Sequence, residues 1–161
     1  MRTWGLIGYP LGHSFSRKFF TDKFARENLD EQYLNFELER ISLLPSVIGE
    51  HPELDGLNVT IPYKEQVIAF CDRLDPVATE TGAVNTIRIS RQNKLLLLEG
   101  YNTDVHGFSE SLAPLLNPVL KSALILGTGG AAKAVKYALD KLGILWLQVS
   151  RNPSGEKMIR Y

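Results

Sequence analysis

Three side chains able to hydrogen-bond or transfer a proton lie within seven positions of each other: Asn58, Thr60 and Lys64. Residues 57–61 predict a short strand, and we expect a helix over residues 63–74. Strand ends that turn into helices are where α/β proteins place their polar chemistry. A cation in a first helical turn opposes the helix dipole, which favours acids there. The position of Lys64 therefore indicates a functional lysine, with a solvated surface lysine as the alternative.

Two serines lie earlier in the chain, on either side of an aromatic residue, in the segment Ser14-Phe15-Ser16. The segment follows a short predicted strand and precedes a predicted helix that ends near residue 27. Two hydroxyls and the N–H groups of a helix start can bind an anion. The alternative is that Ser16 is the N-cap of the helix and Ser14 is solvated.

Two more polar positions begin predicted elements. Asn85 precedes a strand, which a polar turn at residues 91–94 joins to a returning strand in a hairpin. It is either a turn former or a ligand contact. Asp104 begins a predicted helix over residues 104–116, capped by Asn102 or Thr103. An aspartate in a first helical turn also has an ordinary explanation in the helix dipole.

A glycine-rich turn begins at Gly127. The apolar run 123–126 predicts a parallel strand buried on both faces. The pattern G-x-G-x-x-A follows at once, and then a predicted helix over 131–142 and a second strand over 145–149. Because a strand precedes the glycines and a helix follows them, the segment is a predicted dinucleotide site, with the pyrophosphate at the helix N-terminus.

The residues after the second strand bear on the choice of cofactor. An NAD site would place Asp or Glu there to hold the ribose hydroxyls. This chain has Ser150-Arg151-Asn152 instead. A guanidinium suits a 2′-phosphate through forked, charge-assisted hydrogen bonds, so NADP is the predicted cofactor. A solvated charge is the alternative for Arg151.

Composition narrows the class of protein. The 161 residues carry 18 basic and 18 acidic side chains, and no basic run stands out, which argues against a nucleic-acid partner or an anionic membrane surface. The single cysteine, Cys71, cannot form an intrachain disulfide, and we expect it to be a small buried core residue in a helix. No segment reads as a signal peptide or a membrane span, so we expect a cytoplasmic protein without a membrane partner. No metal site is predicted.

In their order along the chain, these motifs resemble those of the shikimate dehydrogenase family. The motifs are Gly8-x-Pro10-x-x-His13-Ser14-x-Ser16, Asn58-Val-Thr60-x-Pro62-x-Lys64, Gly82-Ala-Val-Asn85-Thr86, Gly100-x-Asn102-Thr103-Asp104 and the Gly127 turn. The resemblance covers nearly the whole chain. It departs from the family at Arg17 and Phe20-Thr21, where the family has proline and His-Asn, and we expect only the local packing to differ.

The resemblance implies a role for each motif. Ser14 and Ser16 bind the substrate carboxylate, Thr60 and Asn85 contact the ring oxygens, and Lys64 and Asp104 form the catalytic pair, Asp104 also contacting substrate. Gly127, Thr128, Gly129, Gly130 and Ala131 hold the cofactor pyrophosphate. Ser150 and Arg151 also bind the cofactor, Arg151 at its 2′-phosphate. The implied reaction is NADPH-dependent, reversible reduction of 3-dehydroshikimate to shikimate. A homodimer is one option for its assembly.

The implied fold is α/β. A three-layer α/β substrate domain over residues 1–102 is followed by the start of a Rossmann-type NADP-binding domain over 103–161. A dinucleotide domain normally has about six strands, and roughly two are predicted here, so we expect the domain to be incomplete and this chain alone to have negligible turnover. The alternatives are a quinate/shikimate dehydrogenase using NAD, a methylenetetrahydrofolate dehydrogenase-like enzyme, or a fragment that binds ligand without catalysis.

Overall fold

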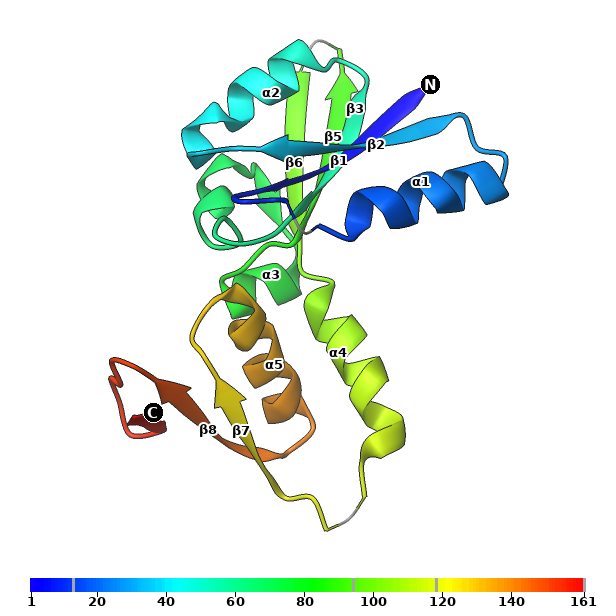
Figure 1. The fold of residues 1–161 in the computed structure, drawn as a ribbon. Coiled ribbons are helices and arrows are strands. Elements are labelled where there is room, and N and C mark those ends of the chain that lie inside the picture. Colours follow the sequence, from blue (N-terminus) through cyan, green and yellow to red (C-terminus); the bar gives the residue numbers. More distant parts are fainter. Residues whose placement is uncertain (13, 94, 118, 161) are drawn as a thin grey trace. The chain divides into compact units, whose positions relative to one another are not determined.

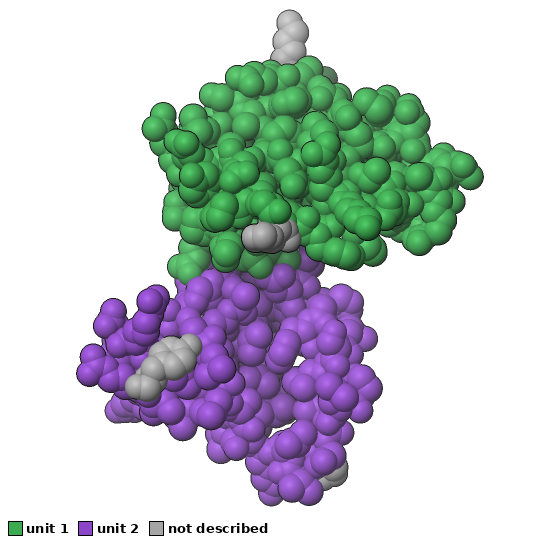
Figure 2. Space-filling model, in the orientation of Figure 1, with its two compact units in different colours: residues 1–75, 84–101 green, residues 76–83, 102–161 purple. Residues whose placement is uncertain are grey.

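The computed structural model describes residues 1–12, 14–93, 95–117 and 119–160. His13 of the first motif, Lys94 of the predicted turn and Pro118, expected to end a helix, lie outside the described residues. The chain divides into two compact units, coloured separately in Figure 2. Unit 1 comprises Met1–Asp75 and Val84–Tyr101, and unit 2 comprises Pro76–Ala83 and Asn102–Tyr161. The domain boundary at residue 102 stays a prediction, and unit 2 also takes in residues 76–83.

Unit 1 is built on a mixed six-stranded sheet in the order β2-β1-β3-β5-β6-β4 (Figure 1). Its strands are β1 (Arg2–Gly8), β2 (Glu31–Glu37), β3 (Leu54–Val59), β4 (Arg73–Leu74), β5 (Thr86–Gln92) and β6 (Leu95–Tyr101). β1 pairs in parallel with β2 and β3, while β5 is antiparallel to both β3 and β6. The predicted α/β class is confirmed. The alternating pattern of the chain explains the sheet, because residues two apart face the same side.

The helices of unit 1 cover the sheet with apolar side chains. They are α1 (Ser16–Arg26), α2 (Leu44–Glu50) and the short 3-10 helices η1 (Ile41–Leu43) and η2 (Gln66–Phe70). α1 packs on β1 and β2, where Phe24 joins the buried residues Leu6, Leu11 and Tyr33. Two of these residues, Leu6 and Leu11, line the same cavity as Ser14 and Ser16.

The predicted helix over residues 63–74 is wrong. The segment forms a turn, the 3-10 helix η2 and the short strand β4, so Lys64 does not lie in an α-helix and the dipole argument for it fails. The reason is tertiary pairing: Asp72 donates its backbone N–H to Leu98 O at 2.8 Å, and its carboxylate accepts the Leu98 N–H at 2.8 Å. These bonds draw the chain into the sheet beside β6. Cys71 is half-buried at the end of η2, and burial raises the pKa of its thiol to about 11, which leaves it protonated and unreactive at neutral pH.

Two further expectations for local structure are corrected. Arg91 and Gln92 still pair with β6, so the hairpin turn is shorter than residues 91–94, and Asn93 adopts the positive φ of 50° that tight hairpin turns require. The helix expected over 104–116 ends as an α-helix at Leu112 and continues as a 3-10 turn. Pro114 explains this, because proline lacks an N–H and clashes with the preceding helical turn.

Unit 2 holds a three-stranded parallel sheet in the order β7-β8-β9. Its elements are α3 (Pro76–Thr81), α4 (Asp104–Leu112), η3 (Ala113–Leu115), β7 (Ser122–Leu126), α5 (Gly130–Lys141), β8 (Leu145–Ser150) and β9 (Met158–Arg160). α5 covers one sheet face, where Leu139 packs on Ile125 and Trp146, and α4 packs against α5.

The expectation that β7 is buried on both faces is wrong for this chain. Leu124 and Leu126 are 63% and 70% exposed, and Leu145 on β8 is 70% exposed. These leucines alternate with the residues that α5 covers. Within the described residues, no helix covers the face on which they lie.

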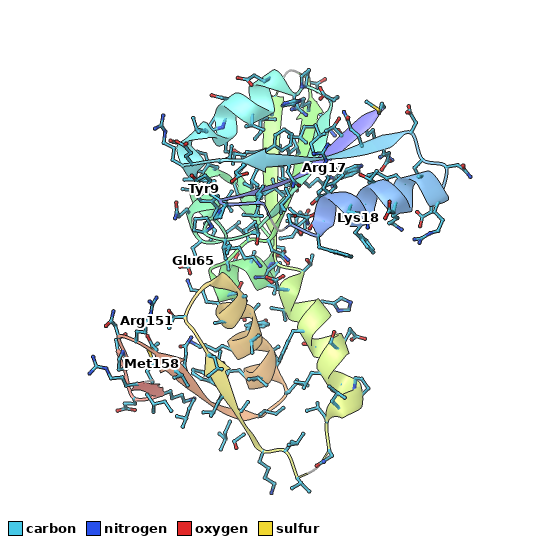
Figure 3. The ribbon with its side chains drawn as sticks, viewed as in Figure 1. Tyr9, Arg17, Lys18, Glu65, Arg151 and Met158 are labelled. Carbon is cyan, nitrogen blue, oxygen red and sulfur yellow. The ribbon has the colours of Figure 1, made fainter. Side chains whose placement is uncertain are left out.

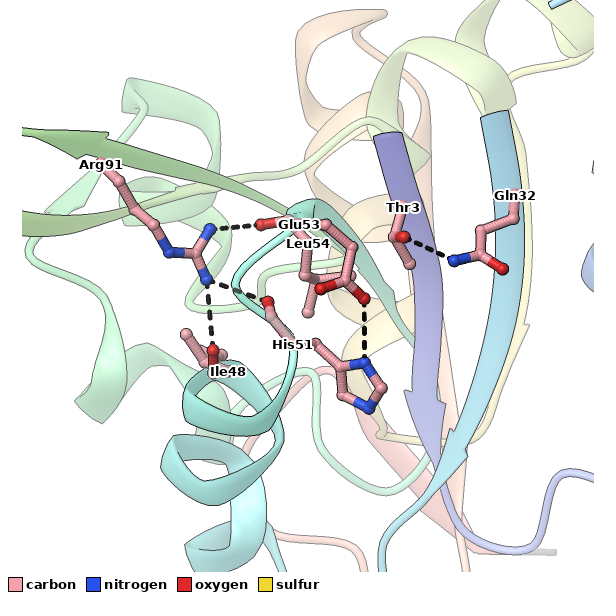
Figure 4. A network of polar contacts seen from close by, with 7 residues as sticks. All are labelled: Thr3, Gln32, Ile48, His51, Glu53, Leu54 and Arg91. Carbon is pink, nitrogen blue, oxygen red and sulfur yellow. Dashed lines mark hydrogen bonds and ion pairs between the residues drawn. The ribbon is translucent and has the colours of Figure 1, made fainter. Parts of the chain in front are cut away.

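Arg91 links three carbonyl groups of unit 1 (Figure 4). Its guanidinium donates to Leu54 O at 2.6 Å, to Ile48 O at 3.2 Å and to His51 O at 3.2 Å. Ile48 and His51 lie at the end of α2, whose last carbonyls have no intrahelical partner. Arg91 therefore caps α2 and ties it to the start of β3.

We expect Arg91→Ala to lower the free energy of unfolding of unit 1 by about 1–3 kcal/mol, since it removes charge-assisted bonds to three carbonyls. Arg88→Ala is the matched control, because Arg88 is exposed and only approaches Glu99 at 3.8 Å, a contact worth about 0–1 kcal/mol. Urea denaturation followed by Trp4 fluorescence, with Trp146 replaced by Phe, reports on unit 1 alone. Equal losses from the two variants would contradict the capping role.

No helix in the described part of the chain is both long enough and apolar enough to span a membrane. Among the same residues, no cluster of three or more His, Cys, Asp or Glu side chains could hold a metal ion.

Candidate active site

Three of the residues predicted to bind substrate line one pocket in unit 1. Ser14, Ser16 and Thr60 line a cavity of about 460 Å³, whose remaining lining residues are apolar. Each of the three is half-buried. A hydroxylated anion could therefore contact several hydroxyl groups here while keeping some exposure to water.

Ser16 does not cap α1 with its side chain. It is the first residue of the helix, the N-cap position belongs to Phe15, and no side chain bonds the first N–H groups. The Ser14 N–H donates to Leu11 O at 2.9 Å, which fixes the loop before the helix. The hydroxyl of Ser16 slightly lowers the pKa of the Tyr33 phenol on β2.

Thr60 and Lys64 lie on a turn that follows β3. The Thr60 N–H donates to Ile7 O at 2.9 Å, Tyr63 N–H donates to Thr60 O at 2.9 Å, and Val84 N–H donates to Lys64 O at 2.7 Å. Lys64 is half-buried. A Cβ on Gly8 would lie 2.5 Å from the Thr60 methyl group, so only glycine lets the end of β1 approach this turn. The backbone around Lys64 is thus held at several points.

A chain of hydrogen bonds connects Tyr33 on β2 to the second and third motifs. Tyr33 Oη donates to Asn58 Oδ1 at 2.7 Å. Asn58 Nδ2 donates to Thr86 Oγ1 at 3.4 Å, and Thr86 Oγ1 donates to Asn85 Oδ1 at 3.2 Å. Four polar side chains thus form one connected series inside unit 1, from Tyr33 on β2 to Asn85, which precedes β5.

Burial shapes the chemistry of Tyr33. The side chain is 4% exposed, and its ring stacks on Phe20 with centroids 4.6 Å apart. Desolvation raises the pKa of Tyr33 to about 12, against a smaller lowering by Ser16. The phenol therefore stays protonated at neutral pH and can both donate and accept.

Asp104 is positioned in unit 2 by a buried neighbour. Asn102 is 5% exposed, and its Nδ2 donates to Ala83 O at 2.9 Å and to Thr81 Oγ1 at 3.2 Å. Its Oδ1 accepts the Val105 N–H at 3.3 Å, which satisfies one donor at the start of α4. The sequence predicted either Asn102 or Thr103 as the cap of this helix. The side chain that bonds to the helix start is that of Asn102.

Lys64 and Asp104 belong to different compact units. Their catalytic pairing, and the approach of Asp104 to the hydroxyl pocket, stay predictions. The structure brings together Ser14, Ser16 and Thr60 in the pocket, and it joins Asn85 to Asn58 of the second motif through the Thr86 hydroxyl.

The predicted pyrophosphate loop in unit 2 has the geometry that its glycines allow. Gly127 has φ +108°, a left-handed conformation that other residues rarely adopt, and the Cβ positions of Gly127 and Gly129 face open space. Gln148 holds the loop, since its Nε2 donates to Gly127 O at 2.8 Å. α5 begins at Gly130 and includes Ala131 in its first turn, so free backbone N–H groups gather where a phosphate would bind.

The predicted 2′-phosphate residues line the same cavity as this loop. Gly127, Thr128 and Gly129 form one wall of a space of about 880 Å³, and Ser150, Arg151, Asn152, Ser154 and Met158 form the rest. Arg151 is exposed at the end of β8 (Figure 3). A strong cation and several hydroxyl and amide groups therefore face the same space as the glycine turn.

Sequence reasoning missed four residues that organise these sites. They are Tyr33, Asn58 as a network member, Gln148 and, as a buried hub, Asn102. The only signal for Gln148 was a polar residue inside an apolar strand. Asn58 was predicted only as a hydrogen-bonding side chain and Asn102 only as a possible helix cap, without the partners that the structure gives them. Tyr33 gave no signal, because a tyrosine in an alternating strand looks like an ordinary core residue.

Comparison with known proteins identifies a protein family that this chain resembles in sequence and in structure. The family described as "Shikimate dehydrogenase substrate binding domain" matches residues 6–87. The shikimate dehydrogenase (NADP(+)) of Dictyoglomus thermophilum is 39% identical over 155 residues, covering 96% of this chain and 55% of the relative. That of Syntrophomonas wolfei is 45% identical over 142 residues, covering 87% and 47%. The chain spans about half the length of the curated relatives it matches.

Solved structures agree with the sequence comparison. Shikimate dehydrogenase 1 from Peptoclostridium difficile has a TM-score of 0.86 at 36% identity, covering 100% of this chain and 61% of that one. The Thermus thermophilus enzyme in complex with NADP(H) and shikimate has a TM-score of 0.79 at 32% identity, covering 95% and 57%. The matched residues 6–87 include the first three motifs. They therefore contain Ser14, Ser16, Thr60 and Lys64. The chain belongs to the shikimate dehydrogenase family.

Proposed function

We propose that this chain supplies the substrate site and the start of the cofactor site of an NADP-dependent shikimate dehydrogenase. The reaction is the reversible reduction of 3-dehydroshikimate to shikimate with NADPH. The observation that carries the proposal is the hydroxyl pocket of Ser14, Ser16 and Thr60, with Lys64 on the turn that follows Thr60. A hydroxylated cyclic acid presents a carboxylate and ring oxygens, which match hydroxyl and amide groups.

The residues of unit 2 fit the cofactor. The open Cβ positions of Gly127 and Gly129 let backbone N–H groups approach a pyrophosphate, and Arg151 offers a guanidinium to a 2′-phosphate in the same cavity. When bound, NADP(H) supplies the hydride chemistry. The Thermus thermophilus relative was solved with NADP(H) and shikimate, which supports this assignment.

The side chains of this protein bind, orient and move a proton. Ser14 and Ser16 donate to the carboxylate, and Thr60 and Asn85 bond to the ring oxygens. Lys64 donates a proton to the oxygen of the substrate carbonyl as the alcohol forms, and removes it in the reverse direction. Asp104 orients the ammonium of Lys64 and contacts the substrate. A homodimer and a cytoplasmic location stay predictions.

The test is an assay of the enzyme at the full length of its relatives. Shikimate and quinate are each oxidised with NADP and with NAD, and the four values of kcat/KM are compared. We expect shikimate with NADP to give the highest value. Higher values for quinate with NAD would replace the proposal with the quinate/shikimate alternative, and no oxidation of either substrate would overturn both.

We expect the double variant Ser14→Ala/Ser16→Ala to weaken shikimate binding and leave NADP affinity unchanged. Each hydroxyl that donates to a carboxylate contributes roughly 1.5–3 kcal/mol, so the loss from both is about 100-fold or more. Calorimetric titration of shikimate measures it. Ser46→Ala, an exposed serine on α2 outside the pocket, is the control. Unchanged shikimate affinity in the double variant would place the carboxylate elsewhere.

A further inference from the structure

Asn85 is held beside the turn that carries Lys64 by bonds of its backbone. Its N–H donates to Tyr101 O at 3.0 Å, and its carbonyl oxygen accepts the N–H of Val59, the last residue of β3, at 2.8 Å. The N–H of the preceding residue, Val84, donates to Lys64 O at 2.7 Å. The position of Asn85 is therefore fixed by the sheet, and what remains to be set is the orientation of its side-chain amide.

The two ends of an asparagine amide are similar in size and opposite in polarity. Oδ1 only accepts hydrogen bonds, whereas Nδ2 has two protons to donate. The Thr86 hydroxyl distinguishes the two ends of Asn85, since it donates to Oδ1 at 3.2 Å. Because Oδ1 is bonded to Thr86, a ligand that bonds to the amide meets the Nδ2 protons.

Thr86 donates to Asn85 because its own oxygen already accepts a bond. A hydroxyl has a single proton, and Asn58 Nδ2 donates to Thr86 Oγ1 at 3.4 Å, which leaves that proton for Asn85. Tyr33 Oη donates to Asn58 Oδ1 at 2.7 Å and so sets the orientation of the Asn58 amide. The phenol has a proton to donate at neutral pH, because burial raises the pKa of Tyr33 to about 12. The direction of the series thus runs from Tyr33 to Asn85.

We propose that Thr86 is a positioning residue that fixes Asn85 as a hydrogen-bond donor to a ring oxygen of the substrate. The inference rests on the proposed function, because it assumes that Asn85 contacts the substrate ring. A donor suits both directions of the reaction, since a hydroxyl oxygen and a carbonyl oxygen can each accept a hydrogen bond. The reversed amide could bond only to a hydroxyl. Thr86 sets the orientation before the substrate arrives, which lowers the cost of ordering the site on binding.

Thr86→Val keeps the branched shape of the side chain and replaces its hydroxyl by a methyl group. Asn85 then loses the bond that distinguishes its two ends. We expect shikimate to bind the full-length enzyme about tenfold more weakly, with KM raised, kcat changed less than about threefold and NADP affinity unchanged. Thr86→Ser keeps the proton, and we expect its shikimate affinity to lie within about threefold of the wild type. Calorimetric titration and steady-state kinetics measure these values.

A double-mutant cycle tests whether Thr86 acts through Asn85. We expect Asn85→Ala to weaken shikimate binding and Thr86→Val to be silent in that background. An ionised aspartate has no proton to donate, so Asn85→Asp should weaken shikimate binding at least as much as Asn85→Ala. Thr3→Val is the matched control: the Oγ1 of this buried threonine accepts from Gln32 Nε2 at 2.8 Å outside the series, and we expect unchanged affinity (Figure 4). Thermal midpoints verify that all variants are folded.

The inference is overturned by any of three results in an enzyme whose wild type binds shikimate. The first is a Thr86→Val enzyme with unchanged affinity, or a Thr86→Ser enzyme that binds as weakly as Thr86→Val. The second is a tenfold loss from Thr86→Val that persists in the Asn85→Ala background. The third is wild-type affinity in Asn85→Ala or Asn85→Asp. Failure of the wild-type enzyme to bind shikimate would instead overturn the proposed function, and the inference with it.

Discussion

Replacing Lys64 with alanine in the full-length enzyme is expected to lower kcat by about 10²–10⁴-fold while KM for shikimate changes far less. Proton transfer to or from the substrate oxygen occurs in the transition state, so its loss slows the reaction without weakening the bound ground state. The bonds that fix the Thr60–Tyr63 turn are backbone bonds and survive the substitution. Steady-state kinetics of shikimate oxidation with NADP measure both constants.

Two matched variants sharpen this test. Lys64→Arg keeps a positive charge that does not give up its proton, and we expect kcat to stay as low as in the alanine variant. Lys18→Ala removes an exposed lysine of α1 (Figure 3) and should leave kcat unchanged. A Lys64→Ala enzyme within a few-fold of the wild-type kcat would remove Lys64 from the mechanism.

The same kinetics address the pairing of Lys64 with Asp104, which the structure leaves as a prediction. Groups that act as a unit give strongly non-additive effects. In an Asp104→Ala background, Lys64→Ala should therefore cost much less than in the wild type. Full additivity would show that the two residues act independently.

Arg151→Ala is expected to weaken NADPH binding by about 10–100-fold and to change NADH affinity less than about threefold, because only NADPH carries the 2′-phosphate. Arg151 is exposed and lines the cavity that the glycine turn also forms, so the substitution removes a cation without opening a core. Cofactor titration by fluorescence, with the kcat/KM ratio for the two cofactors, measures the change in preference.

Arg160→Ala on β9 is the control for losing one exposed cation from the same unit, and it should preserve the preference for NADPH. Equal weakening of both cofactors by Arg151→Ala would indicate a general charge effect. An unchanged ratio would place the phosphate contact elsewhere.

The elements around Gly127 could be predicted because their signals are local. An apolar run, a glycine that must adopt positive φ and an amphipathic helix each specify their own conformation, and β7, α5 and β8 appear where the pattern places them. The exposed face of β7 could not be predicted in this way. Leu124 and Leu126 are apolar whether or not anything covers them.

Where distant partners decide the conformation, local patterns failed. The apolar spacing after Pro62 fits a helix, but the bonds between Asp72 and Leu98 favour a strand over that continuation. The hydrogen bond of Tyr33 likewise depends on Asn58, which only the fold brings to it. The motifs identified Ser14, Ser16 and Thr60, and the structure shows that all three line one pocket.

The division of unit 1 into Met1–Asp75 and Val84–Tyr101 has a consequence for how the protein is made. β3 meets β5 at Leu57 and Ile87, and β4 meets β6 at Leu74 and Gly100, so each half of the sheet depends on the other. On the ribosome, the sheet cannot close until the residues of β6 have emerged, after α3 has already left the exit tunnel. The edge of β3 is unpaired until β5 has emerged, and the edge of β5 is then unpaired until β6 follows. The nascent chain thus exposes an unpaired strand edge throughout the interval between the synthesis of Val59 and that of Tyr101.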